Sequence, residues 1–350
     1  MTDRRAGHPV VSVVIPCYNA ESTIISCLES LYSQHFVSME IVCVDDGSTD
    51  STEIILNENQ LQHPELVVVR QSNSGAWLAR LAGIRAAAGD YIMFLDSDDT
   101  AAPGFIEKMY SCASALNSDL VVCGFNRINV DTGLVMSSEF CDARSSFSLK
   151  SEPGKLLQIN PAPWNKIFKA SLLHGVNELS VSPVMLDDLS LLLLALLQSD
   201  GDVFYLPEAL VEYRVHQDSA INSINECQLK DAIAAMVEIR SCYETSKSSR
   251  MLEAFDSVAF VHVVVSMSFR ILGSDSENKS HVIASLIEAA DSEFPLWRTS
   301  RYLRIGYGCK HGGLFYKASL ASALVKVGLL MPALRVYRLI RNALGKDISW

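Results

Sequence analysis

Short apolar runs alternate with longer stretches of helical periodicity over the first 125 residues of the chain. The runs with the length and composition of buried strands are 10–15, 40–44, 66–70, 91–95 and 120–123. The helix-length stretches between them are 21–34, 51–59, 75–87 and 103–116. Strands that alternate with helices predict βαβ units and a mostly parallel sheet flanked by helices.

This alternation stops after Gly124. The elements expected next are a hairpin with loops at 125–160, a short helix at 164–173, a helix that begins at Asp187, and strands at 203–206 and 209–215. From about residue 225 the pattern is helical throughout. We therefore expect an α/β domain at 1–222 and a helical C-terminal region with a basic tail at 223–350.

Composition limits the class of protein. Hydrophobic residues make up 49% of the chain, which is ample for a packed core. None of the nine cysteines forms a C-x-x-C pair, so a zinc site is not expected, and without a signal-peptide pattern the thiols indicate a reducing cytoplasm. The most apolar helical stretch, 257–269, is shorter than the roughly 20 residues that a membrane span needs.

The net charge of −11 is unevenly distributed. Residues 298–350 hold ten Lys and Arg but one acidic residue, Asp347, so a basic tail follows an acidic body. Such a tail is typical of a surface that meets anions. Nucleic acid is not an expected partner, because the acidic body would repel a phosphate backbone.

Within this tail, 318–345 contains a predicted basic amphipathic helix. Its basic positions and the neighbouring apolar stripe are Arg335, Arg338 and Arg341, and Leu330, Leu334, Tyr337 and Ile340. A helix of this kind lies on an anionic membrane surface, or it packs on the acidic body or on a second subunit in a homodimer. The sequence favours neither interpretation.

Two acidic clusters follow predicted strands. Asp45 and Asp46 come after the second strand, and the segment 96–99, which reads Asp-Ser-Asp-Asp, comes after the fourth. In open α/β sheets, ligands bind outside the carboxyl ends of the strands. An Asp-x-Asp there suits a hard divalent cation that also binds phosphate oxygens, because Mg²⁺ takes one or two carboxylates.

The ordered set of motifs resembles the family 2 glycosyltransferases over roughly residues 8–220. The segments that carry the resemblance are VSVVIPCYN at 11–19, VDDGSTD at 44–50, NSG at 73–75, AR at 79–80, GDYIMFLDSDD at 89–99, WNKIF at 164–168, DDL at 187–189 and YRVH at 213–216. Two positions depart from the family's usual pattern. Leu81 stands where the family often has Asn, and Asp187 stands where it often has Glu.

The resemblance implies a GT-A fold and an inverting, metal-dependent glycosyltransferase of the hexosyltransferase type from bacterial polysaccharide biosynthesis. The implied donor is a nucleotide sugar, most often a UDP-sugar, with Mn²⁺ or Mg²⁺ as cofactor. The implied acceptor is a growing, lipid-linked glycan of a capsule, exopolysaccharide or cell wall. Such an enzyme works in the cytoplasm, peripherally at the inner face of the plasma membrane.

The resemblance also implies roles for individual residues. Donor binding falls to Pro16, Tyr18, Asn19, Asp46, Asn73, Gly75, Arg80, Asp96, Ser97, Lys166 and His216. Asp96 and Asp98 are the implied metal ligands, Asp188 the general base with Asp187 as the second choice, and Trp164 an acceptor platform. Simpler interpretations stay open: turn ordering for Asp46, helix capping for the Asp187-Asp188 pair, a surface ion pair for Arg80 and core packing for Trp164.

Two other classes of function compete with a transferase. A non-catalytic sugar-nucleotide-binding scaffold on the same fold would not need the carboxylate pair at 187–188. A receiver-type signalling domain also places acidic residues after strands, but it leaves this pair and the remaining 200 or so residues without a role. The motif set therefore favours the enzyme.

Overall fold

The computed structural model describes residues 8–36, 38–142, 144–199, 202–215, 226–273 and 278–344. The chain divides into two compact units. The first unit consists of Met1–Lys150 and Pro161–Gln217, and the second of Ser151–Asn160 and Asp218–Trp350. The segment Ser151–Asn160, which a single boundary at 222 assigns to the first domain, thus belongs to the second unit.

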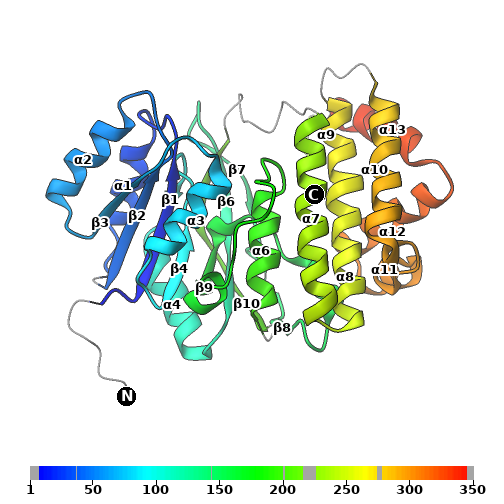
Figure 1. The fold of residues 1–350 in the computed structure, drawn as a ribbon, viewed down its shortest axis with the longest axis horizontal. Coiled ribbons are helices and arrows are strands. Elements are labelled where there is room, and N and C mark those ends of the chain that lie inside the picture. The colour runs from blue at the N-terminus through cyan, green and yellow to red at the C-terminus, as the bar shows by residue number, and fades with distance from the viewer. Residues whose placement is uncertain are drawn as a thin grey trace. The chain divides into compact units, whose positions relative to one another are not determined.

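A single mixed sheet, mostly parallel as predicted, forms the centre of the first unit (Figure 1). Its strands are β1 (Val11–Cys17), β2 (Met39–Asp45), β3 (Leu66–Arg70), β4 (Tyr91–Phe94), β5 (Thr100–Ala101), β6 (Leu120–Asn129), β7 (Val135–Glu139), β8 (Phe147–Ser148), β9 (Lys166–Lys169) and β10 (Asp202–Val215). The main path runs β3-β2-β1-β4-β9-β6-β10-β5. Because β1 to β4 are parallel, their carboxyl ends meet at one edge.

The helices of the first unit are α1 (Ile24–Tyr32), α2 (Thr52–Gln62), α3 (Ala76–Ala86), α4 (Phe105–Leu116), α5 (Ala170–Leu173) and α6 (Asp187–Leu197). Alternate residues of β1 face opposite sides of the sheet. Val13 and Ile15 join the core cluster that includes α1 and α4, whereas Val14 faces Gly83 of α3. A Cβ on Gly83 would lie 2.2 Å from Val14 Cγ1, so this glycine allows α3 to pack closely on the sheet.

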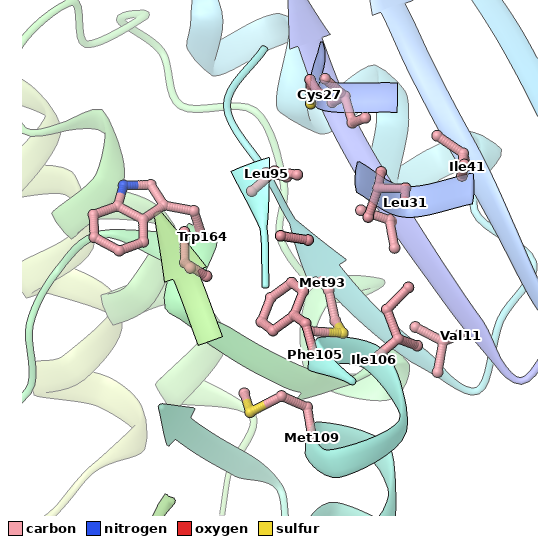
Figure 2. Close-up of a cluster of buried hydrophobic side chains, with 14 of the residues drawn as sticks. Val11, Cys27, Leu31, Ile41, Met93, Leu95, Phe105, Ile106, Met109 and Trp164 are labelled. Atoms are coloured by element: carbon pink, nitrogen blue, oxygen red, sulfur yellow. The ribbon is translucent and has the colours of Figure 1, made fainter. Parts of the chain in front are cut away.

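Figure 2 shows the apolar cluster on one side of the sheet. Leu31 of α1 and Phe105 of α4 are fully buried there, together with Val11 and Met93 from two adjacent strands. Burying a side chain of this size stabilises the fold by about 1.5–3 kcal/mol relative to leaving it exposed. Trp164 lies at the margin of the same cluster.

The predicted helix at 164–173 is wrong for most of its length. The structure has a 3₁₀ turn η2 (Pro163–Asn165), strand β9 and only the single helical turn α5. Ile167 and Phe168 are buried as β9 inserts antiparallel between β4 and β6. Sheet pairing on both sides outweighs the helical pattern of such a short stretch.

The strands predicted at 203–206 and 209–215 form one bulged strand, β10. It runs parallel to β6, with register shifts between Leu206, Ala209 and Val211. The Pro207 between them lacks an N–H for the ladder, which is why the sequence reads as two strands. A bulge lets one strand continue past that proline.

The second unit is helical. Its elements are η1 (Pro153–Gln158), α7 (Glu226–Ser246), α8 (Ser249–Ala259), the π-helical segment η4 (Phe260–Ser266), α9 (Met267–Gly273), α10 (Lys279–Glu293), η5 (Pro295–Arg298), η6 (Arg301–Leu303), α11 (Ile305–His311), α12 (Gly313–Lys326) and α13 (Leu330–Leu344).

In this unit α8, η4 and α9 follow one another as one helix, Ser249–Gly273, of 25 residues. This is longer than the apolar stretch read from the sequence, because the helix continues through its more polar ends. By length and composition alone the helix could cross a membrane, but 78% of its most apolar window is buried inside the protein. It is therefore the core helix of the second unit.

The apolar stripe predicted on the C-terminal helix is partly used for internal packing. Leu330 and Leu334 of α13 are buried, and the Tyr337 ring lies 5.5 Å from the Phe269 ring. Other apolar side chains of α13, such as Leu339, are exposed. The side chains of Arg338, Ile340 and Arg341 lie outside the described residues.

Candidate active site

Asp46, the first residue after β2, ties together two loops at the strand ends. Its Oδ1 accepts hydrogen bonds from Gln71 Nε2 at 2.7 Å and from the Ser74 N–H at 2.8 Å. Its Oδ2 accepts one from the Gly75 N–H at 2.8 Å. An ionised carboxylate has about four acceptor positions, so Asp46 keeps capacity for one further donor.

Two glycines allow these loops to approach each other. Gly47 has a φ of +73°, and a Cβ there would lie 2.7 Å from the Asn73 backbone nitrogen. Gly75 has a φ of +88° and precedes α3. Since positive φ is readily accessible only to glycine, both positions fix the local backbone path. The side chain of Asn73 is exposed on the resulting loop.

The loop after β1 is held against the loop after β2. Asn19 has a φ of +49°, its N–H donates to Ser48 Oγ at 3.0 Å, and its Oδ1 accepts from the Thr49 N–H at 2.8 Å. Asn tolerates this left-handed conformation better than most residues. Tyr18 is 48% exposed beside it, and Pro16 is half-buried near the end of β1.

Arg80 of α3 joins three of the predicted carboxylates. Its Nη1 lies 2.6 Å from Asp187 Oδ2 and 3.0 Å from Asp188 Oδ1, and its Nη2 lies 3.3 Å from Asp96 Oδ1. Arg80 is 5% exposed, so the surface ion pair considered from the sequence is not what forms. The charges of these three carboxylates raise the pKa of the guanidinium despite its burial.

The acidic pair Asp187-Asp188 is preceded by a residue with a strained backbone conformation. Leu186, which precedes α6, adopts the left-handed conformation with a φ of +62°. A non-glycine residue in this region costs about 1–3 kcal/mol and is common at functional sites. Asp187 and Asp188 then occupy the first turn of α6, where the helix dipole favours negative charge.

Asp188 has a perturbed carboxyl group. Burial raises its pKa to about 7, Arg80 opposes the shift, and the charge of Asp187 adds to it. The side chain is 34% exposed as a whole, yet its Oδ1 is buried. That oxygen makes an ion-pair contact with Arg80 without hydrogen-bond geometry, so Asp188 stays less firmly paired than Asp187.

The loop after β4 concentrates acidic groups. Asp96, Ser97 and Asp98 are half-buried, whereas Asp99 is 1% exposed. Asp99 Oδ1 accepts from the Arg214 N–H at 2.8 Å and so fixes the loop to β10, while its Oδ2 has no hydrogen-bond partner among the residues that the structure describes. Burial, followed by the charges of Asp96 and Asp98, raises the pKa of Asp99 well above its usual value.

Lys166 lies in the interior instead of projecting from the strand ends. Its Nζ donates to the Ala162 carbonyl at 2.6 Å and to Asn165 Oδ1 at 2.7 Å, and the residue is fully buried. Burial lowers its pKa to about 7. In this structure Lys166 therefore organises the start of β9, and its contact with the donor diphosphate stays a prediction.

Trp164 is a core residue in this structure. It is 6% exposed, with its ring 4.6 Å from Phe125 and stacked on Tyr213 at 5.3 Å. Of the two interpretations left open by the sequence, the geometry favours core packing over an exposed sugar platform. The guanidinium of Arg127 lies over the other aromatic partner, Tyr213, at 5.4 Å.

One predicted site residue is not described by the structure, and two residues of the site were not predicted from the sequence. His216 lies outside the described residues. Asn165, which donates to the Cys123 carbonyl at 2.8 Å, and Leu186 are not among the predicted site residues, although Asn165 is visible within the WNKIF segment. No sequence signal identifies Leu186, because leucine rarely takes a positive φ.

No group of three or more His, Cys, Asp or Glu side chains is arranged to hold a metal ion by itself within the described ranges. Asp96 and Asp98 nevertheless supply carboxylate oxygens, which are hard donors, on the same loop as Asp99, whose buried Oδ2 has no hydrogen-bond partner within the described ranges. This excess of negative charge fits a divalent cation that takes its other ligands from phosphate and water.

Comparison with known proteins agrees with this arrangement. Residues 12–174 match the family described as glycosyl transferase family 2. Glycosyltransferase EpsH of Bacillus subtilis is 28% identical over 276 residues, covering 74% of this chain and 76% of its own length. The poly(ribitol-phosphate) beta-glucosyltransferase of Bacillus spizizenii is 35% identical over 47% of this chain, but the match spans only 25% of that protein.

Solved structures share the fold. The crystal structure of Staphylococcus aureus TarS 1–349 in complex with UDP-GlcNAc superposes with a TM-score of 0.65 at 20% identity, over 89% of this chain and 91% of that one. The same protein with UDP also gives a TM-score of 0.65, at 18% identity and over 97% and 94% of the two chains. At these identities the likeness establishes the GT-A fold alone.

Proposed function

The chain is a glycosyltransferase whose first unit belongs to family 2, and we propose that it transfers a sugar from a UDP-sugar to a growing glycan with inversion of configuration. The broader role is polysaccharide or cell-wall glycan synthesis. One observation carries the proposal: Arg80 gathers carboxylates from the loop after β4 and from the start of α6 at the carboxyl edge of the parallel strands.

The donor would bind across the strand ends. Asp46 keeps one acceptor position for an N–H of the base, a role that uracil N3–H would fill. Asn19 and Tyr18 lie on the adjacent loop, which is braced against the loop after β2. That TarS binds UDP-GlcNAc and UDP on the same fold supports a uridine nucleotide here.

Asp96 and Asp98 would hold the divalent cation, Mn²⁺ or Mg²⁺. When bound, such an ion offsets the negative charge that develops on the departing nucleoside diphosphate. Asp99 would hold the loop that carries these ligands in place, because it accepts a hydrogen bond from the Arg214 N–H of β10. Arg80 balances part of the surplus negative charge through Asp96.

Asp188 would act as the general base. It would remove the proton from the acceptor hydroxyl while the hydroxyl oxygen attacks the anomeric carbon from the face opposite the leaving group. A carboxyl with a pKa of about 7 is basic enough for this task and still ionises near neutral pH. Asp187 is the weaker candidate, since it is hydrogen-bonded to Arg80 at 2.6 Å.

The acceptor would be a growing glycan chain, carried on a lipid at the inner face of the membrane. Exposed apolar side chains near the C-terminal end, Leu329 just before α13 and Val336 and Leu339 on it, support a peripheral contact with an anionic surface, together with the exposed Arg335. This exposed set differs from the stripe inferred from the sequence, since Leu330 and Leu334 are buried.

A donor screen tests the proposal. Purified protein with Mn²⁺ is given a panel of nucleotide sugars, and the release of nucleoside diphosphate is measured for the unaltered chain and for Asp98→Ala and Asp188→Asn. Asp131→Asn is the matched control, because Asp131 is exposed on the β6–β7 turn, outside the site. We expect release from one UDP-sugar, lost in the two site variants and kept in the control.

Two results would contradict the proposal. Release from a donor other than a UDP-sugar would overturn the uridine assignment while leaving the transferase chemistry intact. Full activity of Asp188→Asn would remove Asp188 from the role of base and turn attention to Asp187.

A further inference from the structure

The second unit contains an open cavity of about 640 Å³ that is separate from every residue proposed for sugar transfer. Three arginines, Arg250, Arg301 and Arg304, line it, together with the hydroxyl-bearing Ser249 and Thr299. All of them belong to the second unit. Neither the family match, which ends at residue 174, nor the sequence motifs reach this region.

The charges around the cavity are not balanced. Glu253 is the one carboxylate among its lining residues, and it is already engaged. Arg301 Nε lies 3.0 Å from Glu253 Oε2, and the Arg301 backbone N–H donates to Oε1 at 2.5 Å. Three guanidinium groups therefore face a single negative charge.

Two of these guanidinium groups have no acidic partner among the described residues. Arg250 forms no ion pair there, and Arg304 makes only a long hydrogen bond, 3.4 Å, from Nη2 to the Thr299 carbonyl. Both side chains are exposed to the cavity and to solvent. They come from different elements, the start of α8 and the residue after η6, so they approach the cavity from two segments of the chain.

Lys326 also lies within reach of the charge of Arg304. The pKa of Lys326 is lowered, first by burial and then by the charges of Arg298 and Arg304. Arg298 is itself neutralised by Asp291, with contacts of 2.7 Å and 2.6 Å. Arg304 therefore contributes positive charge that no nearby acid compensates among the residues that the structure describes.

We propose that this cavity binds a phosphoryl group. A guanidinium presents parallel N–H donors that match two oxygens of a phosphate, and two such forks from different directions suit a tetrahedral oxyanion. The hydroxyls of Ser249 and Thr299 supply neutral donors at the same wall. This proposal rests on the proposed function in one respect: it takes the glycan acceptor to be the molecule that carries the phosphate.

Direct binding to the full-length protein tests this site. Isothermal titration in EDTA uses inorganic phosphate first and a short glycerol-phosphodiester oligomer second. We expect saturable binding that weakens about tenfold or more in the double variant Arg250→Ala/Arg304→Ala, given the strength of charge-assisted hydrogen bonds. Arg85→Ala, which removes an exposed arginine of α3 outside the cavity, should bind like the unaltered protein.

The comparison of probes identifies the source of the phosphate. Tighter binding of the oligomer than of inorganic phosphate, dependent on Arg250 and Arg304, would support a phosphodiester in the glycan chain. Cosedimentation with vesicles of phosphatidylglycerol and phosphatidylcholine, lost in the same double variant, would support a phospholipid headgroup. Since the contacts are ionic and partly exposed, binding should weaken as salt is raised.

Two results would overturn the proposal that the cavity binds a phosphoryl group. Absence of saturable binding to all three probes would do so, and so would an equal loss of binding in Arg85→Ala, because that would indicate a diffuse charge effect. Donor hydrolysis by the unaltered protein is measured separately. Its absence would count against the proposed function alone, whereas intact hydrolysis without phosphate binding would count against this cavity alone.

Discussion

In the first unit, buried charged groups keep polar atoms without hydrogen-bond partners, whereas the buried ion pair of the second unit is fully satisfied. Arg80 Nε, Asp99 Oδ2 and Asp188 Oδ1 are buried and lack such partners among the described atoms. In the second unit, both carboxylate oxygens of Asp256 accept from the Arg240 side chain, and one also accepts from the Leu296 N–H.

The two units differ in how the cost of burying charged groups is offset. A buried polar atom without a partner costs about 1–3 kcal/mol, so a fold keeps such atoms only where something else recovers that cost. In the second unit the pair stabilises the helices that it joins. In the first unit the unsatisfied atoms of the three charged residues Arg80, Asp99 and Asp188 lie around the strand ends, where a ligand would complete their bonding.

The largest expected effect comes from Asp188→Asn. If Asp188 is the base, kcat should fall about 10²–10⁴-fold, because the amide cannot accept the acceptor's proton. The thermal unfolding temperature and UDP binding should stay near those of the unaltered protein. Single-turnover transfer with the matched donor measures the loss. If the variant binds UDP and keeps its transfer rate, the unsatisfied Asp188 Oδ1 has no catalytic role.

Arg240→Ala tests the other side of the comparison. It leaves Asp256, fully buried, without its cation and should destabilise the protein by about 3–5 kcal/mol. Chemical denaturation measures the change. Activity per folded molecule should be unaltered. Glu244→Ala is the matched control, since Glu244 pairs with the same arginine at 3.6 Å but is 60% exposed, and its loss should cost at most about 1 kcal/mol.

The pH profile of kcat/KM, which reports the ionisation of the free enzyme, tests the role of Asp188. A base must be deprotonated, so kcat/KM should rise with pH through the pKa of about 7 and then level off. Arg80→Gln removes a positive charge that stabilises the carboxylate and should move this limb to higher pH. Asp187→Asn removes a negative charge and should move it to lower pH. Shifts of both variants in the same direction would show that another group controls the limb.

The smallest expected effect on stability concerns the outer face of α13. Val336→Ser combined with Leu339→Ser should change the free energy of unfolding by about 0.5 kcal/mol or less, because both side chains are exposed. Leu334→Ala on the buried face should cost about 2–5 kcal/mol. If α13 contacts an anionic surface, vesicle cosedimentation should fall in the double variant. Unchanged cosedimentation would show that α13 serves packing alone.

The sequence by itself determined the parallel part of the sheet, β1 to β4, and the location of the acidic residues. Alternating apolar runs and helical stretches predicted β1 to β4 and the helices between them, because strand and helix periodicities are local properties. Asp46 and Asp96 were then predicted at strand ends, where ligands bind in open sheets. The order of the motifs along the chain indicated the resemblance to the family 2 glycosyltransferases. These inferences need only neighbouring residues, so they survive without knowledge of the packing.

The tertiary structure alone decided how these residues are combined. Arg80 and Asp187 are 107 positions apart in sequence, and their contact exists because α3 and α6 pack together. The burial of Lys166 follows from the insertion of β9 between two strands, which reversed a helix prediction. The arginine cavity joins α8 to a segment some fifty residues later. Contacts of this kind depend on packing between distant segments, which no local pattern encodes.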